Sequence, residues 1–210
     1  MVASEPMASL TVWSFTAAAY TPTGTCVAQP DRVTCGERDA LVDVREALVV
    51  AGSYHVTRFS CRVLGRDDQG ELRCAAGKPT LDYDATEVLR AFGRKEALRV
   101  AHLWGAPAVV TQYLRTGDPK LRAAAEVAAR NAARVAAFDG GREAGVEDAA
   151  WGAVWATKNN AGAVAQAAVW AAKSVGAYSD TAEAAARLSA QKRQSRRLAR
   201  VLQAGAPKAR

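Results

Sequence analysis

The sequence of 210 residues has few side chains suited to acid–base or metal chemistry near neutral pH. Only two histidines are present, His55 and His102, which are too few for a metal site built from several imidazoles. The sequence has no glycine-rich phosphate loop, no Rossmann glycine fingerprint and no Gly-x-Ser-x-Gly nucleophile elbow. These absences argue against the common nucleotide-binding and hydrolase classes. We therefore expect a protein that is not an enzyme and uses no metal or cofactor.

Long hydrophobic runs are also missing. The longest apolar stretches, residues 47–51 and 163–172, are too short or too rich in alanine to cross a membrane, which takes about 20 strongly apolar residues. Residues 1–20 carry Glu5 and no lysine or arginine, unlike a secretory leader. Half of all residues are hydrophobic and 23% are charged, which suits a folded chain. We expect the cytoplasm of a bacterial host cell and no membrane partner.

Acidic residues are absent from residue 187 onward, where eight basic residues occur. The preceding 186 residues hold 20 basic and 21 acidic groups, so the net charge of +7 comes from this end of the chain. On a helix, five of the basic residues form one stripe. Such a stripe is typical of a solvated helix face, of a phosphate-binding surface or of a surface for an acidic protein. Its members are Lys192, Arg193, Arg196, Arg197 and Arg200.

The first part of the chain, residues 1–80, has the pattern of a small β-rich domain. Residues 10–15 predict a strand, and residues 40–50 predict a short helix. Residues 53–76 predict a hairpin whose first strand alternates apolar and polar side chains. A hairpin symmetric about its loop would place Val63 opposite Leu72 and Cys61 opposite Cys74.

The second part, residues 81–210, has a helical period and predicts an Ala-rich helical domain with a basic C-terminal helix. Asp118 followed by Pro119 marks one helix start, and Asp180 with Glu183 predicts the cap of the last helix. The fold class is therefore α+β, with an antiparallel helical bundle or array after the β-rich domain. The helices are expected at residues 85–92, 95–104, 107–114, 119–138, 146–175 with a bend at 159–162, and 180–204.

Between residues 123 and 186, about two residues in five are alanine. Alanine favours helix and lets helices approach closely, so a few large side chains are expected to anchor the core. Trp151 and Trp155 lie four residues apart and hence on one helix face, with Trp170 further along. These tryptophans fit either core anchors or an aromatic stripe that binds a protein partner.

Four cysteines occur at positions 26, 35, 61 and 74. Their spacing differs from that of zinc knuckles. Buried thiols, a metal site and a disulfide are all compatible with the pattern, with buried thiols the main expectation for a cytoplasmic protein. Cys61 and Cys74 are the pair expected to oxidise if any does.

Two sets of stretches carry a resemblance to known proteins. They are residues 35–41, 60–65, 84–92, 97–104 and 113–118 for the first set, and 149–151, 167–172 and 196–198 for the second. Through the first set the chain resembles a group of bacteriophage and actinobacterial proteins that join a β-rich N-terminal domain to an Ala-rich helical half. This resemblance implies an origin in a phage or mobile element, and it supplies no catalytic residue. A Gly-Leu-His-Ala-like motif of that group falls on residues 40–43, which contain no histidine. Through the second set the helical half is also similar to helical arrays of immunity proteins from bacterial toxin systems.

These observations favour a non-enzymatic interaction protein, an inhibitor or accessory factor that binds a host or toxin protein. The alternative is a nucleic-acid-associated protein that contacts phosphates through the basic stripe. A further alternative is an enzyme-like cleft around His55 near Arg58 or Arg62. Self-association into a homo-oligomer is compatible with each of these hypotheses.

Overall fold

The computed structural model describes residues 9–16, 25–35, 38–51, 54–138, 145–173 and 180–207. The chain forms two compact units. The barrel unit comprises Met1–Thr86 together with Leu202–Arg210, and the helical unit comprises Glu87–Val201. The predicted α+β class is confirmed.

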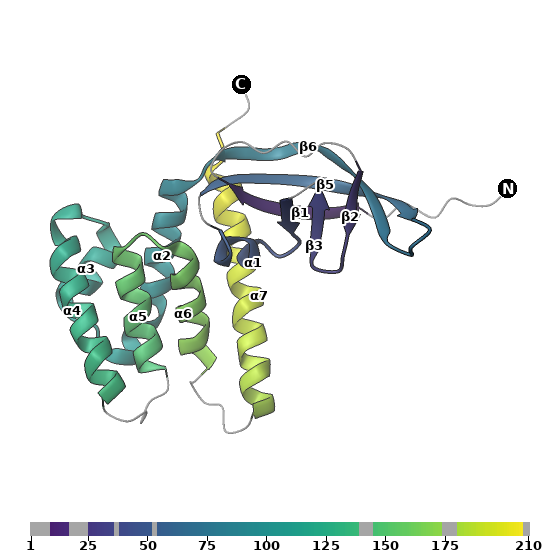
Figure 1. The fold of residues 1–210 in the computed structure, drawn as a ribbon. Helices are drawn as coiled ribbons and strands as arrows, with labels where there is room; N and C mark the ends of the chain where they lie inside the picture. The colour runs from purple at the N-terminus through teal and green to yellow at the C-terminus, as the bar shows by residue number, and fades with distance from the viewer. Residues whose placement is uncertain are drawn as a thin grey trace. The chain divides into compact units, whose positions relative to one another are not determined.

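The described strands of the barrel unit close into an antiparallel β-barrel (Figure 1). Side chains that alternate along each strand meet in its interior, where Val12, Val33 and Phe59 are fully buried. Each of the described strands pairs with a neighbouring strand on both sides. The strand order is β1, β4, β3, β2, β6, β5, with bounds β1 Ser9–Thr16, β2 Thr25–Ala28, β3 Arg32–Cys35, β4 Arg38–Leu41, β5 His55–Arg66 and β6 Leu72–Asp84.

One short helix, α1 (Val44–Val49), follows β4. The helix predicted over residues 40–50 is therefore wrong in its first part, which forms the end of β4. The helix begins where Asp43 can cap it, because its Oδ1 accepts the backbone N–H groups of Arg45 at 2.7 Å and Glu46 at 3.2 Å.

The predicted hairpin is present, but its predicted register is wrong. Cys61 lies opposite Ala76 rather than Cys74, and Val63 lies opposite Cys74 rather than Leu72. Register irregularities interrupt the ladder at three places, so counting outward from the loop gives the wrong partners. The shift amounts to two residues, which preserves the face of each side chain. Both cysteines therefore still point into the barrel.

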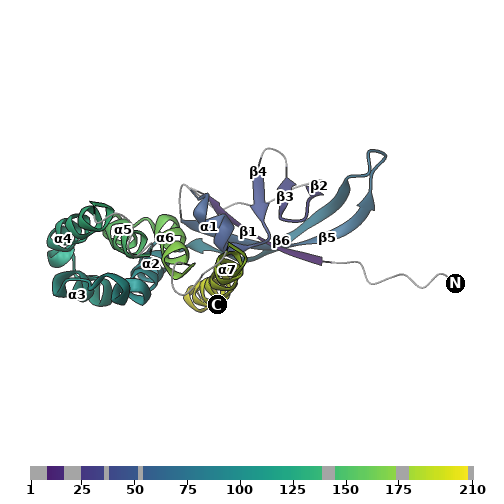
Figure 2. The same ribbon diagram turned by 90° about the horizontal axis from the view of Figure 1, so that it is seen from below.

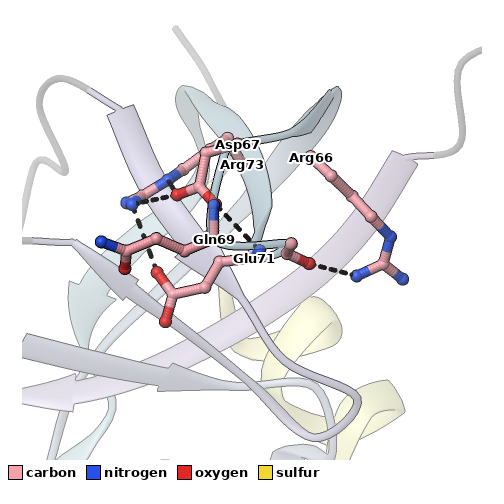
Figure 3. A network of polar contacts seen from close by, with 6 residues as sticks. Arg66, Asp67, Gln69, Glu71 and Arg73 are labelled. Atoms are coloured by element: carbon pink, nitrogen blue, oxygen red, sulfur yellow. Dashed lines mark hydrogen bonds and ion pairs between the residues drawn. The ribbon is translucent and has the colours of Figure 1, made fainter.

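The carboxylate of Asp67 is the centre of a network of polar contacts at the hairpin tip (Figure 3). Its Oδ1 accepts the backbone N–H groups of Gln69 at 3.0 Å and Glu71 at 2.9 Å, and its Oδ2 accepts Nε of Arg73 at 2.6 Å. Partial burial acts against the charged form, but these donors outweigh it and hold the pKa of Asp67 below its ordinary value. The turn is thus fixed by polar contacts at its surface.

In the helical unit, successive helices from α3 to α6 pack against one another, and α6 lies between α5 and α7 (Figures 1 and 2). None of the helices in the described ranges combines the length and apolar character needed to cross a bilayer. The helices are α2 Thr86–Val100, the 3₁₀ helix η1 Ala101–Trp104, α3 Ala108–Thr116, α4 Pro119–Phe138, α5 Val146–Thr157, α6 Ala161–Lys173 and α7 Asp180–Gly205.

The helix starting at Pro119 is confirmed, but two other predicted helices differ. Residues 85–92 and 95–104 form one helix, α2, continued by η1, because Gly93 stays helical and packs against Ala161 of α6. The stretch 146–175 forms two helices rather than one bent helix, and Asn159 turns the chain between them with φ +57°. The last helix begins at Asp180 as predicted, but the side chains of its predicted cap, Asp180 and Glu183, lie outside the described residues.

The change from strand to helix comes later than residue 80. Strand β6 continues through Thr80 to Asp84, whose Oδ1 accepts the backbone N–H of Thr86 at 2.9 Å and so caps α2. Strand β6 also contains Pro79, which has no N–H to give to the ladder. There the Thr80 hydroxyl donates to the carbonyl of Arg58 at 3.2 Å.

Candidate ligand-binding pocket in the helical unit

Helix α2 buries one face, and that face contains a carboxylate. Leu89, Phe92, Glu96 and Val100 recur at helical spacing and are all buried. Glu96 is only 2% exposed. A buried charge is costly unless it is paired and hydrogen-bonded, so its partners define the chemistry of this region.

Helix α7 supplies most of those partners. Arg197 binds the carboxylate with both prongs of its guanidinium, Nε to Oε1 at 2.9 Å and Nη2 to Oε2 at 2.6 Å. Gln194, itself buried, donates from Nε2 to Oε2 at 3.1 Å. Arg99 on α2 adds a contact from Nε to Oε1 at 3.2 Å. Two-pronged arginine–carboxylate pairs are among the strongest polar contacts in proteins, so this network fixes α7 to α2.

Sequence reasoning missed both Glu96 and Gln194. A signal was present for Glu96, because it occupies the same helical stripe as Phe92 and Val100, where an apolar residue is the rule. A lone acid on an apolar stripe indicates a buried partner of opposite charge. Gln194 gave no such signal, since glutamine is common on exposed helix faces.

Beside this network lies a pocket of about 290 Å³ between α2, η1, α6 and α7. Figure 2 shows α2, α6 and α7 from below. Its lining combines apolar side chains of α2, η1 and α6 with charged side chains of α2 and α7. The lining residues are Glu96, Arg99, Val100, His102, Leu103, Ala168, Val169, Ala190, Arg193, Gln194 and Arg197.

The charge in this pocket is unbalanced. Three arginines, Arg99, Arg193 and Arg197, face one carboxylate, Glu96, which leaves a formal excess of two positive charges. Arg197 forms an ion pair with Glu96. Arg193 is exposed and donates from Nη1 to the hydroxyl of Ser189 at 2.6 Å. The arrangement favours an anionic group near Arg99 and Arg193.

The structure divides the predicted basic stripe into two sets. Arg193 and Arg197 line the pocket, and Arg197 is engaged by Glu96. Lys192, Arg196 and Arg200 are exposed along α7 at intervals of four residues, and Nε of Arg200 donates to the Arg196 carbonyl at 3.3 Å. The stripe therefore does not act as one uniform surface.

The three tryptophans predicted to be core anchors or a partner-binding stripe also differ in their surroundings. Trp151 and Trp155 on α5 are partly buried against the main core cluster of the helical unit, with ring centroids 6.3 Å apart. Lys158 Nζ lies 5.3 Å from the ring centroid of Trp155. Trp170 on α6 is 46% exposed. Of the three, Trp170 is the most exposed.

The four cysteines of the barrel unit were expected mainly as free thiols, but only two of them are free. Cys26 and Cys35, on neighbouring strands β2 and β3, form a disulfide. The pair expected to oxidise, Cys61 and Cys74, consists of buried free thiols. The prediction was wrong because it took the two hairpin cysteines as direct partners, whereas Cys74 lies opposite Cys26 and Val63.

The two free thiols are unsuited to nucleophilic chemistry. Burial, together with the neighbouring Cys74, raises the pKa of Cys61 to about 12. Burial also raises the pKa of Cys74, although contact with Cys61 acts in the opposite direction. Both thiols are therefore protonated at neutral pH and chemically quiet.

His55, the centre of the enzyme-like alternative, forms a polar pair on the barrel. Its Nε2 lies 2.8 Å from Oδ1 of Asp82, and the buried hydroxyl of Thr57 donates to the same oxygen at 3.0 Å. Arg58, which was expected near a cleft, places its guanidinium carbon 5.3 Å from the ring centroid of Trp13. Among the described residues, Asp82 is the one carboxylate that pairs with His55.

In the described ranges, no group of three or more His, Cys, Asp or Glu side chains is arranged to hold a metal ion. No protein-family model, curated protein or solved structure matches the chain. The functional conclusion therefore depends on the geometry of the chain itself.

Proposed function

We propose that the chain is a non-enzymatic interaction protein of phage or mobile-element origin, an inhibitor or accessory factor that binds an acidic host or toxin protein. The observation that supports this proposal best is the exposed basic face of α7. Lys192, Arg196 and Arg200 follow one another along that face, and the sequence contains no acidic residue after position 187 to neutralise them. A face of one charge sign attracts a partner of opposite sign and speeds its association.

Apolar side chains on α6 and α7 fit the same proposal. Trp170 is 46% exposed and Leu188 is 51% exposed. Interfaces use large apolar anchors for affinity and surrounding charges for specificity and rate. In this proposal Trp170 is an anchor, whereas Trp151 and Trp155 serve mainly to hold the core. The arrangement of the helices as an antiparallel bundle or array belongs to the proposal as well.

A location in the cytoplasm of the bacterial host is part of this proposal. The buried Cys26–Cys35 disulfide is the observation that opposes it, because disulfides persist mainly in oxidising compartments. Alkylation of the protein in intact cells followed by mass spectrometry decides this point, since a cytoplasmic protein would be recovered with these thiols reduced.

The experiment compares two triple charge reversals in affinity capture from host lysate. The test variant is Lys192→Glu/Arg196→Glu/Arg200→Glu on α7. The control is Arg115→Glu/Lys120→Glu/Arg134→Glu, three exposed positions on α3 and α4 with the same change in net charge. We expect the test variant to lose a stoichiometric protein partner at least about tenfold and the control to keep it. Equal recovery by both variants, or no stoichiometric partner for the unmodified chain, would contradict the proposal.

Binding to nucleic acid is the second candidate, supported by the regular spacing of the same exposed side chains along α7. Each phosphate contact adds to the salt dependence of binding, by about 0.9 in the slope of log affinity against log salt concentration. The test variant should then lose affinity for duplex DNA and show a flatter salt dependence. Nuclease treatment of the captured sample separates the two candidates, because only a protein partner survives it.

A further inference from the structure

The lining of the pocket in the helical unit contains two chemically different kinds of side chain. Val100, Leu103 and Val169 contribute apolar surface, and Arg99 and Arg193 contribute positive charge. The single carboxylate of the lining, Glu96, is shared among Arg197, Gln194 and Arg99, so it does not offset the charge of Arg193. A ligand that fills the pocket therefore meets both apolar side chains and guanidinium groups.

We infer that this pocket binds a small carboxylate with an apolar body. The carboxylate would lie at Arg193 and Arg99, and the apolar body would lie against Val100, Leu103 and Val169. A planar carboxylate matches the fork of an arginine side chain, which favours this pairing over a contact with a neutral oxygen.

Other ligand classes fit the pocket less well. A polyphosphate would bring several charges against the apolar side chains of the lining, which offer them no hydrogen bonds, and this is costly. A neutral hydrocarbon would cover the guanidinium groups without pairing them. The volume of about 290 Å³ lies at the lower end of ligand pockets, which span roughly 300–1,000 Å³, and therefore suits a small molecule or a single terminal residue.

Small residues keep the pocket open. Ala168 on α6 and Ala190 on α7 both line it, and both are almost fully buried. A larger side chain at either position would occupy the space where the apolar body is placed. The Glu96–Arg197 pair holds α7 in position while leaving this space beside it.

The test is titration calorimetry of the full chain with three matched probes: octanoate, octanol and acetate. Octanol has the apolar body without the charge, and acetate has the charge with almost no apolar body. We expect octanoate to bind at least about tenfold more tightly than either. Equal binding of octanol, or no binding of octanoate, would overturn the inference.

Three variants locate the binding. Arg193→Gln should weaken octanoate binding about tenfold, and Ala168→Leu should abolish it, whereas Arg187→Gln, an exposed change on α7 outside the pocket lining, should leave it unchanged. If Ala168→Leu does not fold, Arg193→Gln against Arg187→Gln decides the matter. Octanoate binding that is unaffected by Arg193→Gln would place the ligand elsewhere and refute the site.

A last comparison identifies the source of the carboxylate. A dipeptide ending in a free leucine carboxylate tests a peptide terminus, and octanoate tests a free acid. Once octanoate has bound above the octanol control, tighter binding of the dipeptide identifies a peptide terminus as the source, and weaker binding identifies a free acid. The outcome is independent of the proposed partner surface, because that surface is tested at Lys192, Arg196 and Arg200, none of which lines the pocket.

Discussion

Arg197 on α7 and Glu96 on α2, 101 residues apart in the sequence, form a two-pronged ion pair that attaches the two helices to each other. The carboxylate is buried, and the side chain of Arg197 is only 27% exposed. The pair therefore contributes to stability in a different way from an exposed salt bridge, because breaking it leaves a buried charge with fewer partners.

Replacing Arg197 by methionine should lower the free energy of unfolding by about 3 kcal/mol, since the Glu96 carboxylate would keep only Gln194 and Arg99. The measurement is equilibrium unfolding in urea. Lys192→Met, an exposed change on the same helix, serves as control and should alter stability by less than about 0.5 kcal/mol. The double variant Glu96→Leu/Arg197→Met should recover part of the loss. If Arg197→Met alone is as stable as the unmodified chain, the ion pair between Glu96 and Arg197 is not formed.

The two free thiols should be unreactive in the folded protein and reactive after unfolding. Because burial raises the pKa of Cys61 to about 12, the thiolate that attacks alkylating agents is scarce at pH 8. Iodoacetamide labelling followed by mass spectrometry should find no label in the native protein and labels at Cys61 and Cys74 in urea. Rapid labelling of the native protein would contradict the burial of these thiols.

The same raised pKa predicts a loss of stability at alkaline pH. Above the ordinary thiol value of 9.0, the unfolded chain releases a proton that the folded protein keeps until about pH 12. The unfolded state then binds fewer protons, so the free energy of unfolding falls as the pH rises through this interval. Urea unfolding of the unmodified chain and of Cys61→Ala at pH 8 and pH 10.5 measures the effect. The variant should lose less stability over this interval.

Removing the disulfide should destabilise the barrel unit. Cys26 and Cys35 are nine residues apart in the sequence. A cross-link that closes a loop of this length raises the free energy of unfolding by about 2–3 kcal/mol, because it lowers the conformational entropy of the unfolded chain. The variant Cys26→Ala/Cys35→Ala should therefore unfold at lower urea concentration. Dithiothreitol should have the same effect on the unmodified chain and none on the variant, which separates loss of the disulfide from loss of packing.

The hairpin tip should respond to acid. Because the pKa of Asp67 is lowered in the folded protein, its contribution to stability is fully present above the ordinary value of 3.8 and is lost as the pH falls through the lowered value. Asp67→Asn should remove this dependence and speed amide exchange at Gln69 and Glu71. Asp68→Asn, the neighbouring exposed position, is the matched control and should change neither.

The local signals in the sequence predicted much of the fold. A short apolar run located β1, alternation located the first strand of the long hairpin, and the Asp118–Pro119 pair located the start of α4. These features depend on neighbouring residues, so a sequence contains the information directly. Gly93 shows the limit of such signals. It was taken as a break between helices, but it lies inside α2, where its missing side chain lets Ala161 approach.

The candidate site could not be predicted in the same way, because its parts come from distant segments. Glu96, Ala168 and Arg193 meet only when three helices pack together. Arg197 was correctly placed on a basic helix, but its role is set by a carboxylate 101 residues away. The cysteines show the same effect, since their pairing depends on barrel closure and on bulges that spacing does not reveal.

The order of synthesis gives the end of α7 a special place in folding. The Tyr83 hydroxyl donates to the Leu202 carbonyl at 2.8 Å across 119 residues of sequence, and both residues belong to the barrel unit. The ribosome makes the whole intervening helical unit before this bond can form. Contacts of such long range slow folding, because the chain loses entropy before it gains the contact. The barrel unit therefore gains this contact only after the helical unit has been synthesised.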